Sequence, residues 1–275
     1  AAVRPRFDHG YPPLTLFGLT PFADLSVAQL IMLFAVFSGA FFVKGIFGYG
    51  AVPLLIVAGS FVVEPHHAVV LAELTNFMTH IQYMPEGIAR GQRTLVIRLG
   101  IFLLPSIAVG VWVFAKLDGA ALSMLAGAVI LGSLFADWRG LLDPVAPWVR
   151  NNARVAAPVF GVIAGLISGI IGAGAVSFIS LFVRMFAPDR HGFRATIILV
   201  TATILAWRTL ALGIAGQVTL TIALEALLLL PGGAVAGLLG ARVAKRLIDA
   251  NFFSAYRILL MFGATLMFYR GAAAL

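Results

Sequence analysis

Ten apolar stretches follow one another along the chain, with short polar connections between them. They are Leu25–Lys44, Ala51–Val63, His66–Met84, Thr94–Ala115, Gly119–Trp138, Val155–Ser168, Ala175–Phe186, Phe193–Gly213, Leu220–Arg242 and Phe252–Tyr269. A helix needs about 20 apolar residues to cross a bilayer core, so 275 residues hold roughly eight to ten such segments. Only 11% of the residues are charged, about half of what a soluble domain carries. The sequence predicts an all-α integral membrane protein without a soluble catalytic domain.

The basic residues account for a net charge of +8. They lie mainly in the short connections, where Lys and Arg set the orientation of a membrane protein. We therefore interpret them as topology signals, and expect membrane lipids rather than nucleic acid around the chain. The sequence contains no cysteine, which excludes disulfides, thiolate metal ligands and cysteine nucleophiles. No cofactor is expected.

The lengths of the stretches predict two kinds of helix. Six stretches are long enough to cross the membrane, whereas Ala51–Val63, Val155–Ser168 and Ala175–Phe186 reach only about 18 to 21 Å, short of a core of roughly 30 Å. We expect these three to be half-helices. The most polar connection, Asp137–Arg154, holds two prolines and separates blocks of similar length.

An internal repeat divides the chain in two. Residues 45–52 read GIFGYGAV and residues 169–176 read GIIGAGAV, identical at six of eight positions. The triplet Leu-Leu-Pro ending at Pro105 also recurs at Pro231. We therefore expect an N-terminal tail (1–24), a first transmembrane repeat (25–138), a cytoplasmic linker (139–154) and a second repeat (155–275). The tail lacks the order of a cleavable signal, and its start without Met indicates a processed end.

The distribution of Lys and Arg predicts how the repeats are related. If each glycine-interrupted segment crosses once, basic residues divide 10 against 8 between the two membrane sides, which is no bias. If each enters and returns as a broken hairpin, they divide 13 against 5, a clear positive-inside signal. We therefore expect two inverted repeats, each a glycine-broken hairpin plus three transmembrane helices, with both termini outside. The same parity also fits five crossings in each half.

Paired glycine breaks near the middle of the membrane are typical of transporters, whose half-helix N-termini point at an anion. A helix N-terminus offers free N–H groups and partial positive charge, and glycine lets the backbone approach a ligand. The alternative is that these glycines only permit close helix packing, as the spacing of Gly161, Gly165 and Gly169 also suggests. The predicted substrate-binding positions at the two breaks are Gly45, Gly48, Gly50 and Ala51, and Gly169, Gly172, Gly174 and Ala175.

The residues around the breaks resemble a known family. KGIFGYGAVPLL (Lys44–Leu55), followed by PHHAVVL, and SGIIGAGAVSFI (Ser168–Ile179) resemble the paired glycine motifs of the TauE/SafE family of permeases. That resemblance implies a bacterial inner-membrane transporter of sulfite, sulfoacetate or other sulfonates, coupled to protons. The second motif departs from the pattern at Ala173 and Ala175, where many members carry further glycines.

Three polar residues share one face of the stretch His66–Met84. Glu73, Asn76 and His80 are spaced at i, i+3 and i+7, so they face a cavity or a partner helix rather than lipid. Glu73 and His80 are candidates for proton coupling, and Asn76 for hydrogen bonding to a sulfonate oxygen. The alternative is interhelical hydrogen bonding.

Two cations are further candidates. Arg208 lies two turns after Thr201 on one helix face, where its guanidinium would suit an oxyanion. Because Arg208 is only about five residues from a helix end, we expect it to snorkel to the interface instead. Lys44 lies at the first break: at depth it would meet the anion, and at a shallow tip it would be an interfacial anchor.

The other ionisable residues suggest structural roles. Glu225 and Arg98 precede the paired prolines, so we expect them to form an ion pair, with Glu225 a second choice for proton coupling. His66, His67 and His191 fall in predicted loops and are expected to be solvated.

The function predicted from these features is secondary transport of a small sulfur-containing or organic anion, by alternating access around the two breaks. A passive anion channel is the alternative. A less favoured one is a membrane metalloenzyme, which would have to gather His66, His67 and His80 on one ion.

Overall fold

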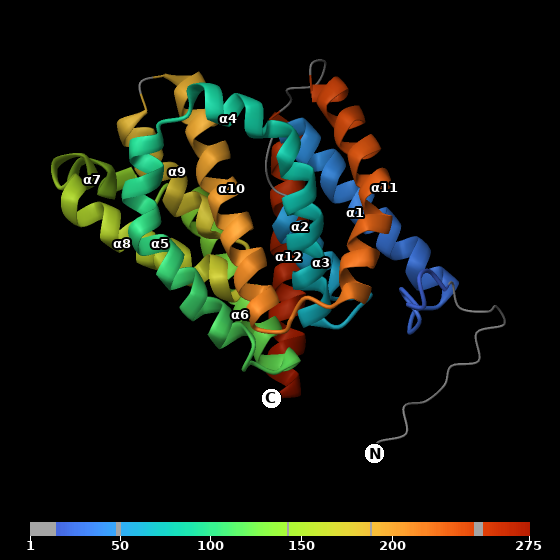
Figure 1. The fold of residues 1–275 in the computed structure, drawn as a ribbon. Coiled ribbons are helices and arrows are strands. Elements are labelled where there is room, and N and C mark those ends of the chain that lie inside the picture. The colour runs from blue at the N-terminus through green and yellow to red at the C-terminus, as the bar shows by residue number, and fades with distance from the viewer. Residues whose placement is uncertain (1–14, 48–50, 142, 188, 245–249) are drawn as a thin grey trace.

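The computed structural model describes residues 15–47, 51–141, 143–187, 189–244 and 250–275. These residues form helices joined by short connections (Figure 1). The elements are α1 Val27–Phe47, α2 Ala51–Gly59, α3 Pro65–His80, η1 Ile81–Tyr83, α4 Met84–Arg90, α5 Arg93–Phe114, α6 Gly119–Trp138, η2 Asp143–Val145, α7 Ala146–Asn151, α8 Ala153–Ile170, α9 Ala175–Phe186, α10 Arg190–Ile214, α11 Leu220–Ala244 and α12 Ala250–Ala274.

The all-helical membrane fold predicted from the sequence is confirmed. Within the described residues, α1, α5, α6, α8, α10 and α11 are long and apolar enough to cross a membrane. One length prediction is wrong, because the expected half-helix Val155–Ser168 is part of the 18-residue α8. Its ends extend into Ala153 and Ile170 because their neighbours are also compatible with a helix. The other two short pieces are short helices: α2 has 9 residues and α9 has 12.

The predicted continuous helix His66–Met84 is interrupted. Helix α3 ends at His80, a single 3₁₀ turn follows, and α4 begins at Met84. Pro85 accounts for the change, since it has no N–H to bond the carbonyl one turn earlier. Taken together, α3, η1 and α4 cover the positions that α10 covers as one helix in the second half.

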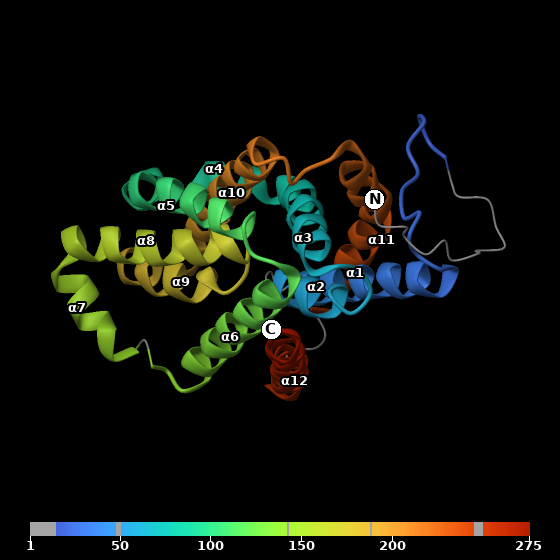
Figure 2. The ribbon, with the colours of Figure 1, turned by 90° about the horizontal axis from the view of Figure 1, so that it is seen from below.

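The order of elements repeats along the chain. The offset that aligns the two glycine motifs also brings α1 onto α8, α2 onto α9 and the α3–α4 unit onto α10. The halves exchange partners, since α5 packs on α8 and α11 packs on α1. Figures 1 and 2 show these two pairs on either side of α3 and α10.

Equivalent helices of the two halves cross antiparallel. Glu73 of α3 contacts Arg208 of α10, whereas His80, further along α3, contacts Ile198, earlier on α10. The reversed order requires opposite helix directions, which Figure 1 also shows for α5 and α11. This is the geometry expected of inverted repeats.

Small residues set the spacing of the exchanged helix pairs. A Cβ added to Gly161, Gly165 or Gly169 of α8 would meet the backbone of α5, at Leu99, Leu103 and Ile107 respectively. Contacts of this kind recur where Gly237 of α11 meets Gly45 of α1. The packing interpretation of these glycines is therefore correct for both Gly45 and Gly169.

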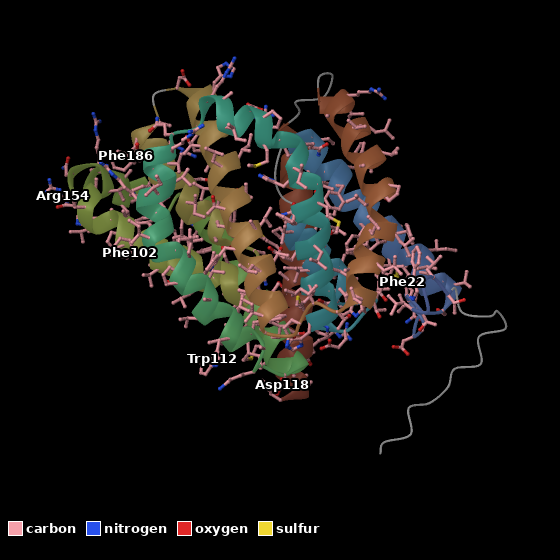
Figure 3. All side chains as sticks on the ribbon, in the orientation of Figure 1. Phe22, Phe102, Trp112, Asp118, Arg154 and Phe186 are labelled. Carbon is pink, nitrogen blue, oxygen red and sulfur yellow. The ribbon has the colours of Figure 1, made fainter. Side chains whose placement is uncertain are left out.

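The two ends of the bundle carry different connections. Figure 3 places Asp118, which caps α6, and Phe186, which ends α9, at opposite ends. The expected linker region contains η2 and α7, and Val149 of α7 is buried. At the other end, the segment before α1 is held by the Phe22 N–H, which donates to Glu225 at 2.8 Å.

Candidate functional site

The second glycine break is a sharp left-handed turn between α8 and α9. Gly172 has φ +83° and Gly174, the N-cap of α9, has φ +88°. A side chain rarely adopts this backbone conformation, so glycine is required here for geometry. The break leaves the first N–H groups of α9, beginning at Ala175, without helical partners. An anion at this position would be stabilised by those groups.

Arg208 of α10 lies directly against this break. A Cβ added to Gly172 would be only 2.7 Å from Arg208 Nη1. The arginine is 1% exposed, its Nη1 donates to Glu73 Oε2 at 2.6 Å, and its Nε donates to Gly169 O at 3.4 Å. The expectation that Arg208 snorkels is therefore wrong. Because a carboxylate and a backbone carbonyl are available at depth, the guanidinium stays inside the bundle.

The ion pair is incompletely satisfied. Glu73 Oε1, Arg208 Nη2 and Thr209 Oγ1 are buried and have no hydrogen-bond partner within the described residues. Buried polar atoms nearly always have partners, so an unpaired donor on a buried cation indicates a place for a water or a ligand. Arg208 Nη2 has no acceptor, and a tetrahedral oxyanion would supply acceptor oxygens together with a negative charge beside the guanidinium.

Lys44, at the end of α1, is the second buried cation. Its Nζ donates to Asn76 Oδ1 at 2.7 Å and to Thr79 Oγ1 at 3.3 Å, and lies 5.5 Å from the ring centre of Tyr83. The side chain is 6% exposed, which contradicts an interfacial anchor. Among the described residues, no carboxylate forms an ion pair with it. Its described neighbours are therefore an amide, a hydroxyl and an aromatic ring.

Helix α3 carries the partners of both cations. Glu73 and Asn76 are three residues apart, about 4.5 Å along the helix axis. His80 completes the face, with Nε2 3.1 Å from Ile198 O of α10. The interpretation that Glu73, Asn76 and His80 form interhelical hydrogen bonds is thus correct. The same contacts place this face of α3 between Lys44 and Arg208. Thr79, which sequence reasoning missed, belongs to the same set.

The other predicted binding positions are placed as follows. Gly48 and Gly50 lie outside the described residues. Ala51 and Ala175, which begin α2 and α9, are buried. Thr201 is half-buried two turns before Arg208.

Glu225 does not pair with Arg98, so that prediction is wrong. Glu225 of α11 is 3% exposed; its Oε2 lies 2.6 Å from His67 Nε2, and its Oε1 accepts from Phe22 N. Arg98 is exposed on α5. The prolines that suggested the pair are equivalent in sequence but lie on helices that pack on different partners. The three-way contact instead joins the segment before α1 to α3 and α11.

His66 and His67 are not the solvated loop residues that the sequence suggested, because α3 begins at Pro65. His66 Nδ1 lies 3.0 Å from Glu64 Oε1 in the connection before α3, and this hydrogen bond lowers the pKa of the Glu64 carboxyl. His191 is exposed, in the first turn of α10. No three His, Asp or Glu side chains of the described part of the chain gather as a metal ion would require.

The fold and this site are those of a multi-pass membrane protein of the transporter class, with helices broken beside buried charges. The chain belongs to the family described as "Sulfite exporter TauE/SafE", which it matches over residues 31–268. It is 29% identical, over 225 residues, to a probable sulfite/organosulfonate exporter TauE of Cupriavidus necator strain H16, covering 80% of this chain and 86% of the relative. No solved structure matches the chain. The family resemblance seen in the motifs is thereby confirmed, and the family points to a transporter rather than an enzyme.

Proposed function

We propose that this protein is a secondary transporter of a small sulfur oxyanion, sulfite or a simple sulfonate, in the bacterial inner membrane. The observation that carries the proposal is the buried Arg208, which lies against Gly172 at the second break and has an unpartnered Nη2. The relative from C. necator, named for sulfite and organosulfonates, supports the substrate class.

In this proposal the anion binds between the two breaks. Arg208 and the free N–H groups at the start of α9 hold its oxygens from one side. Lys44, with Asn76 and Thr79, supplies further hydrogen-bonding groups one turn further along α3.

The exchanged packing supports alternating access. Because α1 packs on α11 and α8 on α5, each broken helix moves with a helix of the other half. Rocking of the two pairs about α3 and α10 would open the site to one side and then the other. We assign proton coupling to the α3 face that carries Glu73 and His80, with Glu225 less central because it binds the segment before α1.

Uptake by proteoliposomes tests the proposal. Under an imposed inward proton gradient, the wild-type protein is expected to accumulate labelled sulfite or ethanesulfonate above the external concentration. A passive channel would give only equilibration, and an unrelated function no protein-dependent flux.

A matched pair of double variants tests the site. Replacing both Glu73 and Arg208 by Gln removes the buried charges together, so neither is left unpaired. This variant is expected to lose uptake. Replacing Glu86 and Arg194 by Gln removes an ion pair of 3.3 Å between α4 and α10, in which Arg194 is exposed and Glu86 half-buried, and should leave uptake intact. Equal uptake by both variants would contradict the assigned site.

A further inference from the structure

The guanidinium of Arg208 has one feature that bears on how an anion and a proton are linked. Its Nη1 donates to Glu73 Oε2 at 2.6 Å, its Nε donates to Gly169 O at 3.4 Å, and Nη2 has no partner within the described residues. A tetrahedral oxyanion can accept from Nη2 and from the second N–H of Nη1. The anion and the Glu73 carboxylate would then share the positive charge of one guanidinium.

We propose that Glu73 and the transported anion compete for Arg208, so that each bound anion brings one proton onto the Glu73 carboxylate. This inference rests on the proposed function and adds the mechanism of its coupling. When an anion binds Arg208, two negative groups share one cation in a place where Glu73 is 1% exposed. The second buried negative charge is strongly disfavoured, and a proton from the solution on the open side neutralises the Glu73 carboxylate.

Arg208, Glu73 and the anion together stay neutral through this step. In the empty state, Arg208 is positive and Glu73 negative. In the loaded state, the anion balances Arg208 and the protonated Glu73 is neutral. The proton adds to one carboxylate oxygen without any bond being broken, and Glu73 Oε1, which has no partner in the described structure, is free to receive it. The summed charge of Arg208, Glu73 and the bound anion is zero in both states, so the interior gains no net charge.

The neighbouring ionisable groups have partners of their own. Around Glu73, α2 contributes no titratable side chain, and Asp137 of α6 lies at the far end of that helix. The others and their partners are Lys44 of α1 with Asn76, His80 of α3 with Ile198 O, and His67 of α3 with Glu225 of α11. Arg208 is therefore the charged group that contacts Glu73, and an anion bound to Arg208 acts on Glu73 directly.

One consequence is electrical. A monovalent anion that moves with one proton carries no net charge. The membrane potential, worth about 2.3 kcal/mol per charge per 100 mV, then contributes nothing, and the pH difference alone drives transport.

Calorimetric titration of the purified wild-type protein with ethanesulfonate tests the inference. This anion carries no titratable proton near neutral pH, so titrations in buffers of different ionisation enthalpy report protons taken up by the protein. About one proton per bound anion is expected, and the affinity should rise about tenfold for each pH unit that the solution is lowered. Binding without proton uptake would overturn the inference while leaving the proposed function standing, whereas absence of binding would contradict the proposed function itself.

Two variants locate the proton. Glu73→Gln should bind ethanesulfonate with no proton uptake and with an affinity independent of pH. Glu86→Gln, which lacks the half-buried carboxylate near Arg194, should keep the wild-type proton uptake. Proton uptake that persists in Glu73→Gln would place the proton on another group and overturn the assignment. If Glu73→Gln does not fold, the proton count and pH dependence of the wild type decide whether anion and proton are linked.

Discussion

Gly172 and Gly174 differ in one respect that allows the arginine site to be tested without changing any charge. Both have positive φ, so alanine costs about 1 to 2 kcal/mol of backbone strain at either position. At Gly172 the added Cβ would lie 2.7 Å from Arg208 Nη1, whereas at Gly174 its closest neighbour is Val129 Cγ1 at 3.2 Å. Only the first substitution has to move the guanidinium.

The expected loss follows from the hydrogen bond that is disturbed. A hydrogen bond to a charged group contributes about 1.5 to 3 kcal/mol, which corresponds to roughly a 10- to 100-fold change in a dissociation constant. Gly172→Ala should therefore weaken ethanesulfonate binding by that factor. Gly174→Ala should weaken it less than about threefold, because the valine side chain can move aside.

Binding by calorimetry and thermal unfolding of the same samples separate the two effects. Both variants should unfold at lower temperature than the wild type by a similar amount, since both carry the backbone strain. If the two variants bind equally well, or if Gly172→Ala binds like the wild type, the guanidinium is not part of the anion site and the reasoning fails.

Three further predictions concern topology, packing and the segment before α1. In a chain without native cysteine, Ala115→Cys should react with a membrane-impermeant maleimide in intact cells and Ala89→Cys should not; the reverse pattern would contradict the inverted arrangement. Gly165→Val should lower the unfolding temperature strongly, because its Cβ would lie 2.6 Å from a carbonyl of α5, while Gly39→Ala, with open space around its Cβ, should not; equal effects would refute close packing of α8 on α5. Glu225→Gln should speed proteolysis of residues 15–24, because the acceptor of the Phe22 N–H loses its charge; unchanged proteolysis would show that other contacts hold this segment.

The helical membrane fold could be predicted because apolar length and glycine punctuation are local properties of a sequence. The start of α9 at Ala175 follows directly from Gly174, which ends the left-handed turn. Helix α3 was predicted too long because the effect of Pro85 extends one turn back along the chain. The full length of α8 was missed because Ala153 and the polar Arg154, which precede Val155, and the residues after Ser168 are also compatible with a helix.

The charged pair could not be derived from the sequence, because it joins residues 135 positions apart. Distance from a helix end suggested that Arg208 snorkels, and only tertiary packing provides the carboxylate that keeps it buried. One signal was available in the sequence. Glu73 and Arg208 carry opposite charges, and each lies in an apolar stretch that occupies the same place in its repeat. Glu225 and Arg98 gave the same signal and are not paired, so the signal alone does not identify partners.

The central claim is that the transported anion lies between Arg208 and the start of α9. An experimental structure with a bound brominated alkyl sulfonate, located by the anomalous signal of bromine, tests it most directly. The account predicts the sulfonate oxygens within hydrogen-bond distance of Arg208 Nη1 and Nη2, beside Gly172. Sulfonate bound elsewhere, for example in the cavity near Glu64 and Arg270 at the end of the bundle where α6 begins, with the Glu73–Arg208 pair intact, would contradict it.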